Sequence, residues 1–213
     1  MHKYVLIPGR HHVVTRFQTD YIEKLIQGEV DSYGERSRIQ LDEHPIFVWA
    51  ITSANHANTR RNPIPGDRRL GMIEHVMACE SYESLTFRIT NMEPKPDFAH
   101  YLIEEINLQS RGNVVLTPEN CIVATSTPDV IKQYVDLGFS ITPLELDYDV
   151  ERFTTPRAWD IGERIIDREK WQSDEYIQKY MHPESLRYYE RYNLADLIVD
   201  TFSDPLALDD GDI

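Results

Sequence analysis

Several features that mark other protein classes are scarce or missing in this sequence. Cysteine occurs only twice, at Cys79 and Cys121, which excludes a framework of several disulfides. The longest apolar run, "IFVWAI" at 46–51, has the length of a buried strand and is far short of a bilayer span. Residues 1–10 lack the apolar stretch of a secretory signal. We therefore expect a reduced, cytoplasmic setting and no membrane partner.

Positive charge is also scarce, since 22 Lys and Arg stand against 36 Asp and Glu for a formal net charge of −14. A broadly acidic surface repels phosphate backbones, so a nucleic-acid partner is not expected. Gly-x-Ser-x-Gly and Walker sequences are absent, which argues against the hydrolases and P-loop enzymes that carry them. No second His/Cys cluster has zinc-ligand spacing, so no metal site is expected.

The sequence does contain short apolar runs that alternate with amphipathic segments. Strands are expected at 3–9, 44–53, 84–91, 121–125 and 139–146. Helices are expected at 15–28, 66–80, 96–108 and 127–138, followed by helical segments at 157–171 and 183–202. The clearest helix has Thr127 as N-cap, Pro128 at its first position and Gly138 just past its end. This alternation predicts an α/β, Rossmann-like parallel sheet of about five strands with helices on both faces.

The 213 residues are enough for one well-buried core with a helical appendage. We expect a nucleotide-binding α/β domain over 1–150 and a C-terminal helical part, 151–205, packed on the same domain. The acidic tail 206–213 is expected to be solvated.

Parallel sheets bind ligands beyond the carboxyl ends of their strands, at the switch point in strand order. The loops to watch are therefore 8–16, 52–66, 91–97 and 124–128. The second of these loops and the helix start that follows it contain Arg60, Arg61, Arg68 and Arg69. Guanidinium groups bind phosphate in bidentate fashion, so this concentration of charge in an acidic protein favours an anionic ligand. The alternative is a solvated basic loop.

Four blocks of these loops, read in order, resemble the nucleotidyltransferase superfamily, specifically nicotinamide mononucleotide adenylyltransferases of the bacterial and archaeal type. The blocks are "YVLIPGR", "ITSANHANTRRNPIPGDRRLGMI", "FRITNMEPKPDFAHYLIEEI" and "CIVATSTPDVIKQYVDLGFSI". The resemblance covers roughly residues 3–180. In the family, Gly-Arg is followed by His-x-Gly-His, whose imidazoles hold the triphosphate. Here Thr15 and Gln18 align with the two histidines, and Phe17 aligns with the glycine.

The resemblance implies transfer of adenylate from ATP to a mononucleotide such as NMN, with Mg²⁺ arriving with the triphosphate. It implies catalytic roles for Arg10, Thr15, Gln18 and Arg68. It implies nucleotide-binding roles for Pro8, Gly9, His11, His12, Arg16, Asn62, Arg61, Thr125 and Arg157. The family's second signature, Ser-x-Thr followed by Arg, lies opposite "RAWDIGERI", where Thr154 and Thr155 would have to supply the hydroxyls.

Each of these residues also has an ordinary structural interpretation. Gly9 would simply allow a tight turn, and His11 and His12 would be loop histidines instead of replacements for the missing pair. Thr15 and Gln18 would be an N-cap and an exposed side chain. The indoles of Trp159 and Trp171 are expected to pack in the core. Stacking on a nucleotide base is the less favoured alternative. Arg157 and Arg164 would reach the phosphates or form surface ion pairs.

Two functions therefore remain open at this point. One is an active nucleotidyltransferase acting on ATP and a mononucleotide in NAD metabolism. The other is a catalytically inactive nucleotide-binding sensor or partner subunit on the same fold. Small-molecule nucleotides are the expected partners in both, and self-association into a homo-oligomer stays open.

Overall fold

The centre of the molecule is a parallel β-sheet. The structure, a computed structural model, describes residues 1–33, 38–90, 97–144, 146–147, 152–153, 156–166 and 170–207. Its sheet has five strands in the order β3-β2-β1-β4-β5. They are β1 (His2–Gly9), β2 (Leu41–Ile51), β3 (Glu83–Arg88), β4 (Cys121–Ala124) and β5 (Ser140–Thr142). All neighbouring pairs in this sheet run parallel, which confirms the predicted α/β class.

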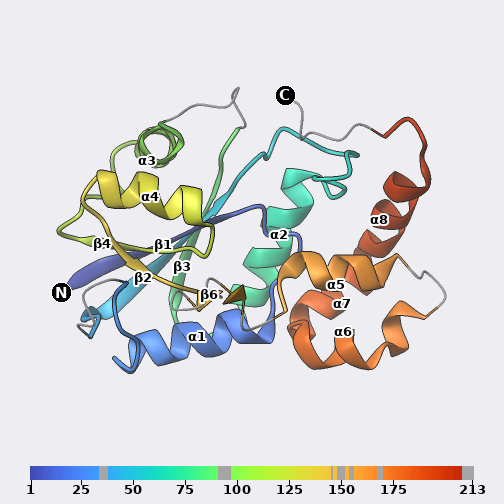
Figure 1. Ribbon diagram of the computed structural model, residues 1–213, viewed down its shortest axis with the longest axis horizontal. Coiled ribbons are helices and arrows are strands. Elements are labelled where there is room, and N and C mark those ends of the chain that lie inside the picture. The colour runs from blue at the N-terminus through green and yellow to red at the C-terminus, as the bar shows by residue number, and fades with distance from the viewer. Residues whose placement is uncertain are drawn as a thin grey trace.

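The central strands are apolar on both faces because helices cover both. Alternate residues of β1 enter different cores, with Val5 and Ile7 on one side and Tyr4 and Leu6 on the other. The helices α1 (Arg16–Ile26) and α2 (Gly66–Met77) pack on the first side. The helices α3 (Phe98–Gln109) and α4 (Pro128–Asp136) pack on the second, as Figure 1 shows.

The C-terminal helices extend the first core. They are α5 (Ala158–Ile165), α6 (Glu175–Tyr180), α7 (Pro183–Tyr192) and α8 (Leu194–Ser203), with a 3-10 turn at Trp171–Ser173. A short antiparallel pair, β6 (Leu146–Asp147) and β7 (Arg152–Phe153), precedes them. The buried side chains of the C-terminal helices and the 3-10 turn belong to the same hydrophobic cluster as Val5 and Trp49, among them Ile161, Trp171 and Tyr189. The four helices lie side by side beyond α2 (Figure 1). No helix in the described part of the chain is long and apolar enough to cross a membrane.

Three elements differ most from the sequence prediction. The segment 183–202 is two helices, because Asn193 adopts the left-handed conformation (φ 52°) that Asn tolerates better than most residues. The helix expected over 157–171 ends at Ile165. The fifth strand covers only 140–142, since Pro143 has no N–H to continue the ladder. Three parts of the sequence prediction lie outside the described residues. They are the hydroxyls of Thr154 and Thr155, residues 91–96, and residues 208–213, which form most of the acidic tail.

The strand order places the switch point beside β1. From β1 the chain proceeds through β2 to β3 on one side, and β4 and β5 lie on the other. The carboxyl ends of β1, β2 and β4, at Gly9, Ile51 and Ala124, therefore reach the same edge of the sheet. This edge is where such folds bind ligands.

The start of α2 is held against the loop after β2 by a glycine. A Cβ on Gly66 would lie 2.3 Å from the carbonyl oxygen of Ala54 and 2.7 Å from its Cα. Only a residue without a side chain permits this approach, so the Pro65-Gly66 pair fixes how α2 meets the loop. By contrast, a Cβ on Gly162 in α5 would meet nothing within 4 Å.

These two glycines form a matched pair for substitution. Gly66→Ala is expected to lower the free energy of unfolding by about 1–3 kcal/mol, because the backbone of Ala54 must move. Gly162→Ala should raise it by about 0.5–1 kcal/mol, since alanine loses less entropy in a helix. Chemical denaturation of both variants measures the difference. Equal stabilities would contradict the close approach.

Candidate functional site

Two adjoining hollows open at the carboxyl edge of the sheet. Their volumes are about 640 Å³ for the first hollow and about 400 Å³ for the second. They share one wall, formed by Pro8, Gly9, Arg10, Arg61, Thr125, Thr127 and Trp159. The first hollow continues along Thr52, Ser53, Phe98 and Val130. The second continues along residues that include His11, His12, Gln18, Leu144 and Arg157.

The hollows are cationic although the chain is acidic. Arg10 and Arg61 line both, and Arg157 lines the second. Among the described lining residues there is no Asp or Glu. Asp160 lies behind the site and accepts from Arg157 Nη2 at 2.9 Å and from its backbone N–H at 2.8 Å. The hydrogen bond from the Arg157 side chain lowers the pKa of Asp160 and keeps it ionised. This charge distribution favours an anion over a cation in the hollows.

A helix N-terminus adds to the positive potential of the shared wall. Helix α4 follows β4 after a polar turn, Thr125 to Thr127, whose threonines line both hollows. Thr127 is the N-cap and Pro128 the first helical residue, as predicted, and the Thr127 side chain caps no N–H of the helix. The first N–H groups of a helix bind anions well, and the hydroxyls supply further donors.

A buried arginine organises the loops around the hollows. Arg69 is completely buried, and its guanidinium donates only to backbone carbonyls. Nη1 donates to Arg10 O at 2.7 Å and to Thr52 O at 2.8 Å, Nη2 donates to Ser53 O at 2.7 Å, and Nε donates to Ile64 O at 2.9 Å. Burial and the neighbouring charge of Arg10 lower the pKa of Arg69 to about 10, so it stays protonated at neutral pH.

Gly9 and His11 form a tight turn at the end of β1. His11 adopts a left-handed conformation (φ 52°), and its Nε2 donates to Ile7 O at 3.1 Å. The imidazole packs edge-on against Trp49, with ring centroids 5.1 Å apart. A Cβ on Gly9 would lie 3.0 Å from His11 Cε1, so a side chain at position 9 would press on the imidazole. Burial lowers the pKa of His11 to about 4, which leaves the ring neutral.

His12 connects the first loop to two other parts of the chain. Its Nε2 donates to Arg61 O at 2.9 Å, and its own carbonyl accepts from the Tyr189 hydroxyl at 2.5 Å. Burial, followed by the charge of Arg69, lowers the pKa of His12 to about 3. Both histidines are therefore neutral at pH 7 and bonded to the backbone, so neither supplies a positive charge to a phosphate.

Thr15 and Gln18 form a capping box at the start of α1. The Thr15 hydroxyl accepts from Gln18 N at 3.2 Å, and Gln18 Oε1 accepts from Thr15 N at 3.0 Å. The α6–α7 connection covers this helix start, because His182 N donates to Val14 O at 3.0 Å and Thr15 pairs with Met181. Thr15 is buried outside both hollows, whereas Gln18 also lines the second. The contacts of Thr15 are therefore those of a helix N-cap.

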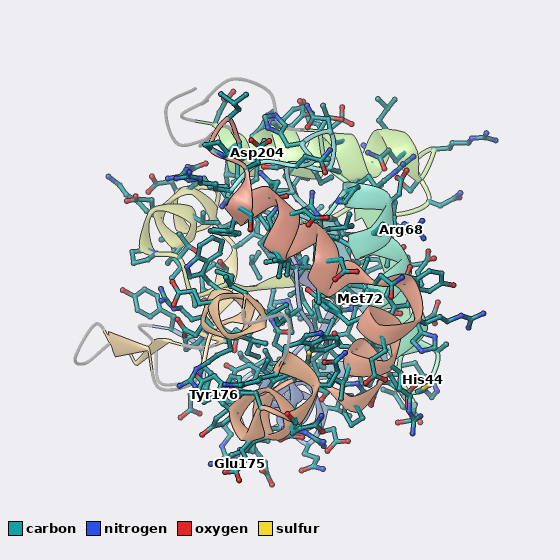
Figure 2. The ribbon with its side chains drawn as sticks, turned by 90° about the vertical axis from the view of Figure 1, so that its right-hand side faces the viewer. His44, Arg68, Met72, Glu175, Tyr176 and Asp204 are labelled. Carbon is teal, nitrogen blue, oxygen red and sulfur yellow. The ribbon has the colours of Figure 1, made fainter. Side chains whose placement is uncertain are left out.

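Besides Thr15, three of the expected site residues do not reach the hollows. Arg68 lies on the exposed side of α2, with its guanidinium carbon 5.3 Å from the ring centroid of Tyr192, beside the C-terminal helices (Figure 2). Arg16 is exposed on α1 and lines neither hollow. Asn62 is buried in a turn where its N–H donates to Thr59 Oγ1 at 3.0 Å. Arg164 forms an ion pair with Asp174 instead, at 3.6 Å.

Arg69, and not Arg68, contacts the loops around the hollows. The sequence contained a signal for this in the spacing of the apolar residues of α2. Arg69 precedes the core residues Ile73 and Val76 by four and seven positions, which places it on the buried face of α2. The sequence also assigned Trp159 to the core. Its indole instead stands at the mouth of both hollows, 38% exposed, and Nε1 donates to Glu163 Oε1 at 2.9 Å. Trp171 is in the core, where it contacts Tyr189.

The described residues do not form a metal centre of their own. They contain no group of three His, Cys, Asp or Glu side chains that could hold an ion. The described lining of the hollows offers hydroxyls, carbonyls and guanidinium groups, a poor donor set for a hard divalent cation. A divalent ion at this site would depend on the oxygens of the ligand.

Comparison with solved structures identifies the same fold in a bifunctional NMN adenylyltransferase/ADP-ribose pyrophosphatase from Francisella tularensis, solved in complex with AMP and a manganese ion. The TM-score is 0.57 at 12% sequence identity, and the match covers 94% of this chain and 52% of the other. This chain thus spans about half the length of that protein. No family model and no curated protein matches the sequence. At this identity the likeness shows the fold alone.

The burial of His11 predicts a loss of stability in acid. In the unfolded chain its pKa is near 6.5, so between pH 6.5 and about 4 the unfolded state binds a proton that the folded state does not. The free energy of unfolding should therefore fall with falling pH over this range, with His11 contributing at most about 1.4 kcal/mol per pH unit.

His11→Asn should reduce this slope, because asparagine tolerates the left-handed conformation and does not titrate. His44→Asn is the control, since His44 is exposed on β2 (Figure 2). Denaturation curves at several pH values measure both. An unchanged slope in His11→Asn would show that the imidazole is not held neutral.

Proposed function

We propose that this protein binds ATP and a mononucleotide such as NMN, or the dinucleotide that they would form, across the switch point of its sheet. The observation that carries this proposal is the cationic wall shared by the two hollows. Arg10, Arg61 and the N-terminus of α4 converge there, while each hollow continues away from them along its own residues.

This arrangement suits a ligand with phosphates in its middle and a flat group at each end. The phosphates would lie on the shared wall, where guanidinium forks and helix N–H groups offer donors. One flat group would enter the first hollow beside Phe98, and the other would enter the second beside Leu144. The indole of Trp159 stands where either group could stack. The AMP bound to the Francisella protein supports this ligand class.

Adenylyl transfer at such a site needs positioning and charge stabilisation more than proton transfer. An oxygen of the mononucleotide phosphate would attack the α-phosphorus of ATP. The bond to the bridging oxygen would break, and pyrophosphate would leave with the electron pair. ATP would enter as its magnesium complex, and Arg10, Arg61 and Arg157 would stabilise the charge on the phosphoryl oxygens.

A second candidate function, nucleotide binding without transfer, is favoured by the capping box. The side chains of Thr15 and Gln18 each accept from the backbone N–H of the other residue, and His11 and His12 are neutral and bonded to carbonyls. Losing one donor to a developing charge typically lowers a rate by about 10²–10³. Among the described residues that line the hollows, the arginines are the cationic side chains that remain to stabilise such a charge.

Binding is tested by calorimetry with ATP, NMN and NAD, with and without Mg²⁺. Arg61→Gln should weaken binding about 10- to 150-fold, the equivalent of about 1.5–3 kcal/mol for one charged hydrogen bond. Arg68→Gln is the matched control and should leave affinity unchanged, because that side chain contacts Tyr192. Absence of heat with every nucleotide would refute the proposal.

Gln18→His separates the two candidate functions, because Gln18 is the capping-box residue that lines the second hollow. If transfer survives, an imidazole there should raise the rate of NAD formation from ATP and NMN at least tenfold. Gln18→Glu, which keeps the acceptor for Thr15 N but adds negative charge, should lower it. Intact binding with no NAD from the wild type or the histidine variant would select binding alone.

A further inference from the structure

A single buried cation joins three segments of the chain beside the hollows. Arg10 follows β1, Thr52 and Ser53 follow β2, and Ile64 precedes α2. The Arg69 guanidinium donates to a carbonyl of each of these four residues. We propose that Arg69 is a positioning residue for the nucleotide site, which fixes the backbone that presents Arg10, Thr52 and Ser53 to the first hollow. This inference rests on the proposed function.

The geometry explains why arginine occupies this position. Nε, Nη1 and Nη2 point in three directions of one plane, and each reaches a carbonyl within 2.9 Å. A lysine ammonium is a compact charge on a single nitrogen. It cannot reach carbonyls that lie in different directions within one plane, as the three nitrogens of a guanidinium do. The chain therefore needs a guanidinium at position 69.

The partners of Arg69 matter as much as its shape. Its hydrogen-bond partners among the described residues are backbone carbonyls, and no carboxylate of those residues pairs with it. Carbonyl dipoles stabilise a buried cation without cancelling its charge, so the charge persists beneath the hollow. An ordinary buried ion pair would hold the loops together but would remove this potential.

The loop after β1 is fixed at a second point by the C-terminal helices. Tyr189 of α7 donates to His12 O, two residues beyond the carbonyl that Arg69 binds. Ser185 of α7 accepts from Val14 N at 3.4 Å and donates to Met72 of α2 at 3.1 Å. Helices α2 and α7 thus hold residues 10–14 from the side opposite the ligand, which leaves the Arg10 side chain directed by a rigid backbone.

The experiment must separate positioning from general stabilisation. Arg69→Ala should speed exchange of the Thr52 and Ala54 amides at least tenfold, because these amides pair with Gly9 O and Ile89 O in the segments that Arg69 joins. Amides within the β1–β2 ladder should exchange as in the wild type. Affinity for ATP or NAD should fall at least tenfold. Arg68→Ala, one residue away, should change neither quantity.

Guanidinium ion supplies the decisive arm. At low millimolar concentration, below its denaturing range, it should restore both amide protection and nucleotide affinity to Arg69→Ala by occupying the vacated cavity, whereas equal NaCl should not. Arg69→Lys, which keeps the charge, should fold with partial protection. The inference is overturned if Arg69→Ala keeps wild-type protection and affinity, if all sheet amides lose protection together without rescue, or if Arg69→Lys equals the wild type. The exchange arm needs no nucleotide, so it tests Arg69 even if the wild type binds none.

Discussion

The loops at the carboxyl edge of this sheet are held together by one buried cation, Arg69. Parallel strands deliver their carboxyl ends to one edge, but the loops that follow have no ladder to hold them. Arg69 replaces that ladder with four donated hydrogen bonds to three segments. Hydrogen bonds from a charged donor are stronger than neutral ones. One side chain therefore holds loops that would otherwise need several hydrogen-bonded turns to fix them. The cost is a desolvated guanidinium, which is visible in its lowered pKa.

The two histidines of the first loop illustrate how residues with catalytic potential serve the scaffold. His11 fills the space above Gly9 and contacts Trp49, and His12 ties the loop to Arg61. Burial lowers the pKa of both imidazoles and keeps them uncharged, and the charge of Arg69 acts in the same direction. The positively charged side chains of the hollows are then arginines alone among the described lining residues. Its strength should vary little with pH through the physiological range, since guanidinium groups do not titrate there.

Much of the fold followed from the sequence because its signals are local. Apolar runs, caps such as Thr127-Pro128 and stops such as Gly138 identified the strands and helices that build the sheet. The break at Asn193 was missed because its left-handed conformation depends on how α7 and α8 pack. Topology also located the site, since the watched loops after β1, β2 and β4 meet there. It did not tell Arg68 from Arg69, because neighbouring helical residues differ by about 100° in direction and the sheet decides which points inward. Trp159 was misassigned for the same reason, because Ile161 and Ile165 hold the opposite face of α5 against the core.

The capping box of α1 has a consequence for how folding and ligand binding are linked. Where a helix begins with unsatisfied N–H groups, an anion that binds them also stabilises the helix, and the ligand-free protein is correspondingly weaker. Here the capping box satisfies the N–H groups of Thr15 and Gln18 internally, and the α6–α7 connection closes over this helix start. The first helix is therefore complete before any ligand arrives. The start of α1 therefore needs no bound anion to hold its conformation, so the stability of this helix should not depend on occupancy of the hollows.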